Sequence, residues 1–207
     1  MSEKEKIIHQ VFLKVTDKTI EDYPIFVEGV KQWKEWCFQN GYRYKLWEKM
    51  PYEYLNEKDK HVLKEVTKRF YFAPVDFIRM PILEHYGGMY VDLDVFPTDE
   101  LIKIIDNETI FGTGLCPNGQ IHINNNVMKC SKENARKMRL FCHQQFDEKI
   151  LIDVYKTWKI RFFLRTVGVS MVSKFVKKEL NYQMIPLDDF KLYFTDHVTR
   201  SWSQHDK

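Results

Sequence analysis

Two aspartates one residue apart, Asp92 and Asp94, follow the apolar run Met89-Tyr-Val91. Residues i and i+2 of an extended segment point to the same side, so an Asp-x-Asp that leaves a strand can direct two carboxylates at one cation. Such hard oxygen ligands suit Mg²⁺ or Mn²⁺, and a site with few protein ligands leaves positions for substrate phosphates. The spacing predicts a divalent-metal site for a nucleotide-diphosphate substrate. Two aspartates that merely end a strand in a solvated turn are the alternative.

A second polar pair precedes this motif at helical spacing. Asp76 and Arg79 are three residues apart in a segment that begins near Pro74, a residue suited to the first turn of a helix. Both side chains therefore fall on one helical face. Gly87-Gly88 then ends the helix and turns the chain into the strand. A surface ion pair, which stabilises a helix by only ~0.2–0.5 kcal/mol, is the alternative for this pair.

Six residues of this region share one register: Asp76, Arg79, Gly87, Gly88, Asp92 and Asp94. In that register the segment closely resembles the DXD segment of sugar-nucleotide glycosyltransferases, in particular Och1-like mannosyltransferases, bacterial capsule and lipopolysaccharide sugar transferases, and the glucosylating clostridial toxins. Four further segments follow the order of that family: residues 7–10, 44–47, 123–128 and 201–202. The resemblance spans nearly the whole chain.

The resemblance implies a single α/β domain of the GT-A type, a Rossmann-like fold whose mainly parallel central sheet is flanked by helices. Residues 1–100 would form the nucleotide- and metal-binding half, and residues 101–207 the acceptor half with a C-terminal lid. The implied activity is that of a hexosyltransferase. It moves a sugar from a nucleotide-diphosphate donor, a UDP-sugar first and a GDP-sugar second, to a hydroxyl of a glycan or glycoconjugate, with Mn²⁺ or Mg²⁺ as cofactor.

Roles for the DXD segment follow from the same resemblance. Asp94 would bind the metal directly, and Asp92 would reach the ribose or the metal through water. Asp76 would contact ribose or sugar hydroxyls, and Arg79 sugar or phosphate oxygens. No catalytic base is assigned.

Three more positions are assigned to the donor by the resemblance. His9 and Gln10 match a His-Gln pair whose surroundings receive the nucleotide base; a buried, hydrogen-bonded histidine is the alternative for His9. Asn125 matches an asparagine that contacts the sugar. Because it stands within the run Asn124–Asn126, an ordinary asparagine turn is the alternative there.

The C-terminal segment supplies the rest of the implied site. Trp202 matches an indole that contacts the diphosphate, and His197 is the expected extra ligand of metal or phosphate, with His205 further along. We expect a lid that becomes ordered when metal and nucleotide bind. We also expect a chain cut after Tyr193 to keep its melting temperature, because few core contacts would be lost. A frayed tail with a chance tryptophan is the alternative.

Composition argues against several other classes. The 207-residue chain has 32 basic and 29 acidic residues and a net charge of +3, so nucleic acid is not an expected partner. No apolar run approaches the ~20 residues that span a bilayer, and no signal-peptide core follows Met1. The four cysteines show no metal-binding spacing: Cys37, Cys116, Cys130 and Cys142. We therefore expect reduced thiols in a cytoplasmic protein without a transmembrane segment.

The elements that must position these residues follow from hydrophobic patterning. Strands are expected over residues 7–12, 42–47 and 109–113. Helices are expected over residues 26–36, 134–146 and 170–180, and one or two surface helices over residues 52–70. Asn40-Gly41 closes the first of these helices. Pro81 lies inside the helix that begins near Pro74, so we expect a kink or a 3₁₀ turn between Phe77 and Pro81.

Two other functions are compatible with an Asp-x-Asp. A haloacid-dehalogenase-like phosphatase uses the first aspartate as nucleophile, but Phe96 stands where that motif has Thr or Val, and Asp76 and Arg79 have no use there. A catalytically silent sugar-nucleotide or glycan-binding module is the other, since a fold and a site do not guarantee turnover.

Asp188 and Asp189 are candidates to hold an acceptor hydroxyl, and a pair at a helix N-terminus is their alternative.

Overall fold

A five-stranded sheet forms the centre of the protein in a computed structural model that describes residues 6–14, 17–68, 73–115, 121–150, 168–180, 182 and 185–196. Its strands, in spatial order, are β2 (Arg43–Trp47), β1 (Ile7–Val11), β3 (Met89–Val91), β6 (Ile121–Lys129) and β5 (Ile110–Leu115). β1 pairs in parallel with β2 and β3, whereas β6 is antiparallel to both β3 and β5. Four of the five strands therefore run in one direction. The predicted α/β class with a mainly parallel sheet is confirmed.

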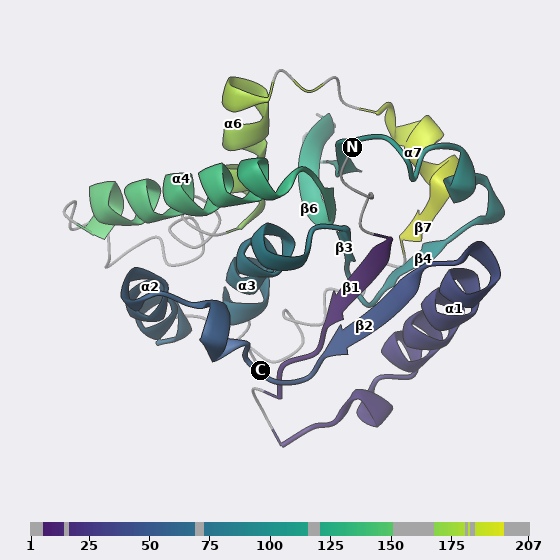
Figure 1. Ribbon diagram of the computed structural model, residues 1–207, viewed down its shortest axis with the longest axis horizontal. Coiled ribbons are helices and arrows are strands. Elements are labelled where there is room, and N and C mark those ends of the chain that lie inside the picture. Colours follow the sequence, from purple (N-terminus) through teal and green to yellow (C-terminus); the bar gives the residue numbers. More distant parts are fainter. Residues whose placement is uncertain are drawn as a thin grey trace.

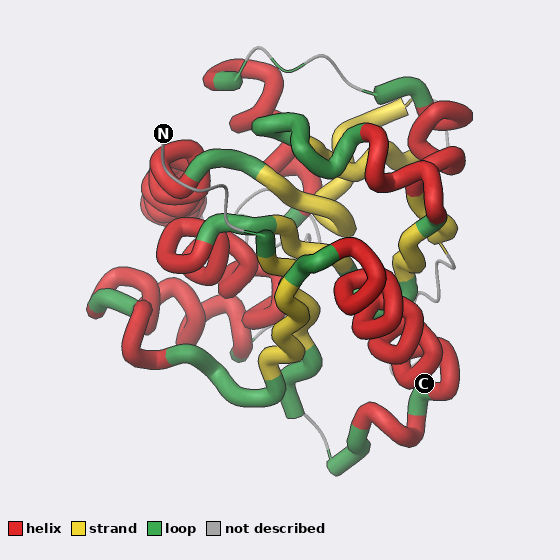
Figure 2. Tube along the Cα trace, turned by 45° about the vertical axis from the view of Figure 1, so that its right-hand side comes forward, coloured by secondary structure: helices red, strands yellow, loops and turns green. Residues whose placement is uncertain are grey.

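Helices cover both faces of this sheet, as Figures 1 and 2 show. The described α-helices are α1 (Pro24–Asn40), α2 (Glu57–Thr67), α3 (Ala73–Tyr86), α4 (Lys132–Ile150), α6 (Val169–Glu179) and α7 (Leu187–Tyr193). Short 3₁₀ helices are η1 (Ile20–Asp22), η2 (Tyr52–Tyr54) and η3 (Asp99–Lys103). α1 lies against one face, and α3 and α4 lie on the other (Figure 1). None of these helices combines the length and apolar character that crossing a bilayer requires.

The alternation of side chains along the strands separates two apolar cores. On β3, Met89 and Val91 pack with Trp33 of α1, whereas Tyr90 faces the core formed with α3 and α4. Trp33 is fully buried, and Tyr90 is 1% exposed. All three residues of this strand are buried, so packing on both faces holds it. The chain that follows β3 is therefore fixed in position.

Local signals that the sequence carries explain the helix ends. Pro24 occupies the first turn of α1, and Gly41 ends that helix in the left-handed conformation at φ 70°. Asn56 caps α2 in a reciprocal capping box with Asp59. Both helices agree with the expected ranges.

The proline in α3 does not change the type of that helix. α3 is α-helical from Ala73 to Tyr86 with Pro81 inside it, so the expected 3₁₀ turn between Phe77 and Pro81 is wrong. Phe77 is fully buried, and Pro81 is buried as well. Burial against the sheet and α4 offsets the ~3 kcal/mol that an interior proline costs.

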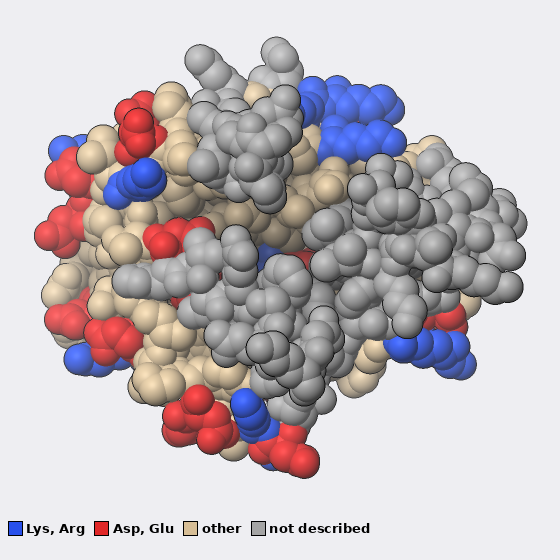
Figure 3. All heavy atoms as spheres, turned by 180° about the vertical axis from the view of Figure 1, so that it is seen from behind, with Lys and Arg blue, Asp and Glu red and all other residues tan. Residues whose placement is uncertain are grey.

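Charged side chains are distributed without a dominant sign. Among the described residues on the face shown in Figure 3, both acidic and basic side chains lie around the rim.

Inside the fold, Cys37, Cys130 and Cys142 are buried and unpaired, and burial raises the pKa of the Cys37 and Cys130 thiols to about 12. Cys116 lies outside the described residues.

A buried ion network holds the helices on the α3 side together. Asp59 of α2 has no exposed surface; it accepts from Arg139 Nη1 at 3.0 Å and contacts His143 Nε2 at 2.8 Å, both on α4. Arg139 Nη2 reaches Glu84 Oε1 of α3 at 2.9 Å. The side chain of Arg139 therefore links α4 to α2 through Asp59 and to α3 through Glu84.

Asp59→Asn should lower the free energy of unfolding by about 3 kcal/mol, because Arg139 loses the fully buried one of its two carboxylate partners. Urea denaturation followed by circular dichroism measures this. Glu57→Gln is the matched control on the same helix, since Glu57 pairs with Lys60 at an exposed position and exposed pairs contribute little. Equal effects of the two substitutions would contradict the structural role of the network.

Candidate active site

The two aspartates lie in a tight turn directly after β3. The Asp92 carbonyl accepts from the Val95 amide at 3.2 Å, which closes the turn and starts β4 (Val95–Pro97). Leu93 between the aspartates is 7% exposed, whereas Asp92 and Asp94 are half-buried. The expected position at the end of an apolar strand is confirmed, with the carboxylates in the turn itself.

β4 lies outside the central sheet and forms a separate two-stranded sheet with β7 (Phe194–Asp196). The pairing is antiparallel and places Asp196 opposite Val95, next to the DXD turn (Figure 1). Phe194 is fully buried and stacks on Phe190 with ring centroids 4.9 Å apart. This contradicts the expectation that the chain beyond Tyr193 makes few core contacts, because β7 belongs to both a sheet and the core.

Arg79 connects three elements at this end of the sheet. Its Nη2 lies 2.8 Å from Asp76 Oδ1 on the same helix and 2.9 Å from Asp92 Oδ1. Its Nη1 donates to the Asn125 carbonyl of β6 at 2.7 Å, and its guanidinium carbon lies 4.5 Å from the centroid of the Tyr90 ring. The side chain is 6% exposed. The alternative of a surface ion pair is therefore wrong.

The carboxyl groups of this network have raised pKa values. Burial raises the pKa of Asp92, and the charge of Asp94 raises it further, while Arg79 and the Tyr90 hydroxyl, which donates at 2.6 Å, oppose the shift. Burial also raises the pKa of Asp76 against the opposing effects of Arg79 and Asn125. One guanidinium thus pairs with two carboxylates, Asp76 and Asp92. A cation bound beside Asp92 and Asp94 would favour the charged form of both carboxyls.

The asparagine run is an irregular segment of β6, and the turn alternative is wrong. The pairing with β5 shifts there, from Phe111 opposite Met128 to Gly112 opposite Asn124. The irregularity lets Asn125 Nδ2 reach Asp76 Oδ1 at 3.0 Å. It matches the general role of bulges, which redirect side chains beside functional sites.

Sequence reasoning missed the neighbour of Asn125. Asn126 Nδ2 donates to Asp196 Oδ2 at 2.7 Å, and its carbonyl accepts from the Asp92 amide at 2.8 Å. A Cβ on Gly112 would come within 1.8 Å of Asn126 Oδ1. The signal that could have revealed this contact is the glycine in the facing strand, which leaves room for a side chain.

His9 and Gln10 occupy the carboxyl end of β1 and are fully buried. The His9 ring accepts at Nδ1 from Trp47 Nε1 at 3.2 Å and donates from Nε2 to the Gly87 carbonyl at 3.1 Å. Burial lowers the pKa of His9 to about 3, so the ring is neutral. His9 is therefore a buried, hydrogen-bonded histidine, which was the alternative to a role beside the nucleotide base.

The remaining candidates fall elsewhere. His197, Trp202 and His205 lie outside the described residues. Asp188 and Asp189 stand in the first turn of α7, as the alternative for them predicted.

The carboxylates present suit a hard cation with few protein ligands. Within the described ranges, no group of three or more His, Cys, Asp or Glu residues lies close enough together to hold a metal ion. Asp92 and Asp94 would therefore supply two ligands at most from this part of the chain. Mn²⁺ and Mg²⁺ accept such sites, because substrate phosphates and water complete their coordination.

Comparison with known proteins agrees with this geometry. Residues 25–111, which include α1, α3 and the DXD turn, match the profile of the family described as "Glycosyltransferase sugar-binding region containing DXD motif". The matched segment is less than half of the 207-residue chain and contains the DXD turn and the helix that carries Asp76 and Arg79. The resemblance predicted from the residues is confirmed.

Individual relatives extend the comparison beyond that segment. The mannosyl phosphorylinositol ceramide synthase SUR1 of Saccharomyces cerevisiae is 35% identical over 129 residues, which are 59% of this chain and 30% of that enzyme. The solved structure of the PaToxG glycosyltransferase aligns with a TM-score of 0.53 at 13% identity, over 86% of this chain and 70% of that one. That likeness concerns the fold, which is of the GT-A type.

Removing the central guanidinium should damage both the fold and the site. Arg79→Ala should cost about 3–5 kcal/mol of unfolding free energy, because Asp76 and Asp92 lose their buried partner. Arg79→Lys keeps the charge but cannot reach three partners with one ammonium, so it should also lower the melting temperature. Thermal denaturation measures both, with exposed Arg136→Lys on α4 as the control. A wild-type melting temperature for Arg79→Lys would contradict the bridging role.

Proposed function

We propose that this protein is a metal-dependent hexosyltransferase that moves a sugar from a nucleotide-diphosphate donor to a hydroxyl of a glycan or glycoconjugate. A UDP-sugar is the first candidate donor and a GDP-sugar the second. The observation that carries the proposal is the convergence of Asp76, Asp92 and Asn125 on Arg79, at the carboxyl edge of the parallel strands. Ligands of open α/β sheets bind at that edge.

In this proposal Asp94 binds Mn²⁺ or Mg²⁺, assisted by Asp92 and by His197. A bound cation would neutralise the charge that grows on the departing diphosphate. Arg79 holds Asp76 and Asp92 in place, so that Asp76 can orient ribose or sugar hydroxyls. Asn125 already donates to Asp76 and therefore assists the same contact. Trp202 closes on the diphosphate from the C-terminal segment.

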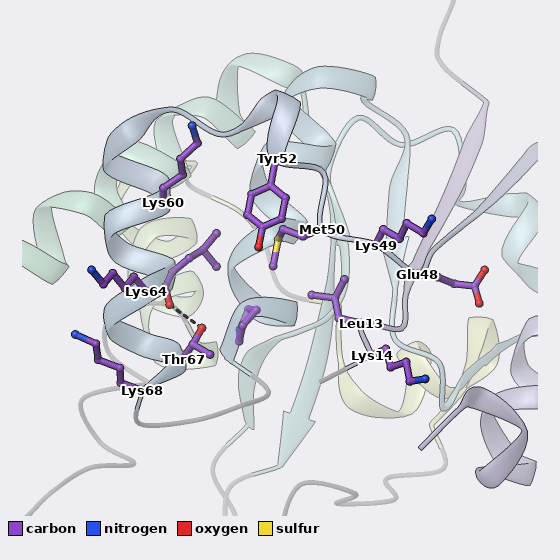
Figure 4. Close-up of a pocket in the computed structure, with 12 residues that line it drawn as sticks. Leu13, Lys14, Glu48, Lys49, Met50, Tyr52, Lys60, Lys64, Thr67 and Lys68 are labelled. Atoms are coloured by element: carbon purple, nitrogen blue, oxygen red, sulfur yellow. Dashed lines mark hydrogen bonds between the residues drawn. The ribbon is translucent and has the colours of Figure 1, made fainter. Parts of the chain in front are cut away.

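A groove of about 690 Å³ provides room for the nucleoside of the donor. It opens beyond the carboxyl ends of β1 and β2, against α2 and the start of α3 (Figure 4). Its apolar lining includes Leu13, Met50, Leu63 and Pro74, with the 63% exposed Tyr52 at one side. Apolar and aromatic surfaces of this kind suit the flat face of a base.

The lysines around this groove favour a nucleoside over an anionic group inside it. Lys64 and Lys68 extend from α2 away from Met50 and Leu13, as Figure 4 shows. Their ammonium groups therefore do not converge within the groove. The diphosphate would instead extend from the groove toward the DXD turn, where the cation binds.

The acceptor is proposed from the relatives. The synthase from Saccharomyces cerevisiae carries inositol-phosphate ceramide in its name, so a glycolipid with a phosphorylated inositol headgroup is the first acceptor to test. The match spans less than a third of that enzyme. Residues 101–207 would form the acceptor half, and residues 1–100 the donor half, of one domain.

Asp94→Asn should abolish metal-dependent nucleotide binding while leaving the melting temperature within a few degrees of wild type, because this half-buried carboxylate serves a ligand. Isothermal titration of UDP and GDP, with Mn²⁺ and with EDTA, measures the effect. Asp99→Asn, at an exposed position in η3, is the control. Unchanged affinity for both nucleotides in Asp94→Asn would contradict the assigned metal ligand.

Two truncations should separate the C-terminal lid from the fold. A chain that ends at Asp196 keeps β7 and Phe194, so it should melt near the wild-type temperature but lose most of the transfer rate with Trp202 and His197. A chain that ends at Tyr193 should melt at a clearly lower temperature. Thermal denaturation and a transfer assay measure the two effects. Full transfer by the chain ending at Asp196 would contradict the lid.

A further inference from the structure

The backbone of the DXD turn is held by side chains that the donor site does not otherwise use. Gln10 Nε2 of β1 donates to the Asp92 carbonyl at 3.1 Å. Trp33 Nε1 of α1 donates to the Val95 carbonyl at 2.7 Å. Both donor side chains are fully buried. The first and last residues of the turn are therefore each fixed by a donor from a different element.

The orientation of the Gln10 amide is itself fixed. The Tyr44 hydroxyl of β2 donates to Gln10 Oε1 at 2.7 Å, which leaves Nε2 for the Asp92 carbonyl. Burial raises the pKa of Tyr44, so this hydroxyl keeps its proton. A chain of two hydrogen bonds thus connects β2 to the DXD turn through β1.

Helix α1 also contacts the middle of the turn. Gly29 lies so close that a Cβ built on it would come within 2.0 Å of the Leu93 carbonyl oxygen and 3.0 Å of the Phe96 ring. Trp33 follows one helical turn later on the same face. A larger residue at position 29 would push the turn away from the Trp33 donor.

A site with two protein carboxylates depends on how rigidly those carboxylates are held. We propose that Gln10 and Trp33 are positioning residues, which fix the backbone of the DXD turn so that Asp92 and Asp94 present their carboxylates to one divalent cation. This inference rests on the proposed metal-dependent function. It gives Gln10 a role in locating the metal ligands, in place of contact with the nucleotide base.

Three substitutions remove single contacts. Gln10→Glu still accepts from Tyr44, but its carboxylate cannot donate to the Asp92 carbonyl. Trp33→Phe removes the indole N–H and keeps a buried ring. Tyr44→Phe releases the Gln10 amide without touching the turn, and it remains informative if Gln10→Glu fails to fold.

The control removes a buried hydrogen bond of the same kind elsewhere. Thr113 is 2% exposed, and its hydroxyl donates to the Ile185 carbonyl at 2.8 Å. Thr113→Val should lower the melting temperature as much as Tyr44→Phe does. A purely structural role for Gln10 and Trp33 would make all these variants alike in metal binding.

Mn²⁺ affinity in the absence of nucleotide, measured by electron paramagnetic resonance, is the deciding readout, with hydrogen exchange at residues 92–95 beside it. We expect Trp33→Phe and Tyr44→Phe to bind Mn²⁺ about tenfold more weakly and to exchange faster at the turn, while Thr113→Val binds as wild type does. Wild-type affinity in both phenylalanine variants would overturn the positioning role and leave the proposed function standing. A wild-type protein that binds neither Mn²⁺ nor nucleotide would overturn both.

Discussion

A single buried guanidinium organises this end of the molecule. Arg79 binds two carboxylates and a backbone carbonyl from α3, the DXD turn and β6, with its side chain 6% exposed. Each carboxylate alone would be costly to bury, and the shared cation makes their proximity tolerable. Burial nevertheless raises the pKa of Asp76 and of Asp92, and a divalent cation beside them would stabilise the charged carboxylates. The packing of α3 and the geometry of the site therefore depend on the same contacts.

The rest of the fold brings the partners of Arg79 to the same edge. Parallel strands place the ends of β1, β2 and β3 side by side, and the irregularity in β6 adds Asn125 from the antiparallel strand. β7 then returns the chain from α7 to a position opposite Val95. Asp196, the last residue that the structure describes, therefore lies near the aspartates of the DXD turn, although about half the length of the chain separates them in sequence.

Patterns local in the sequence were enough to predict much of this. The spacing of Asp76 and Arg79, the glycines at 87 and 88, and the aspartates after an apolar strand each depend on neighbours within a few residues. Contacts between distant segments were not predictable in that way. The Asn126 contact with Asp196, the close approach of Gly29 to Leu93 and the buried role of Gln10 all depend on tertiary packing. For the same reason Pro81 did not produce its expected 3₁₀ turn, since burial of α3 outweighed the local preference.

If this network of carboxylates and arginine is a metal-dependent donor site, the protein should break the bond between sugar and nucleotide diphosphate. The most direct test of this claim is the release of UDP or GDP from a panel of nucleotide sugars by the purified protein, with Mn²⁺ or with EDTA. We predict release from one or few of the sugars with Mn²⁺ and none with EDTA. Equal release under both conditions, or none from any sugar despite metal-dependent nucleotide binding, would contradict the claim.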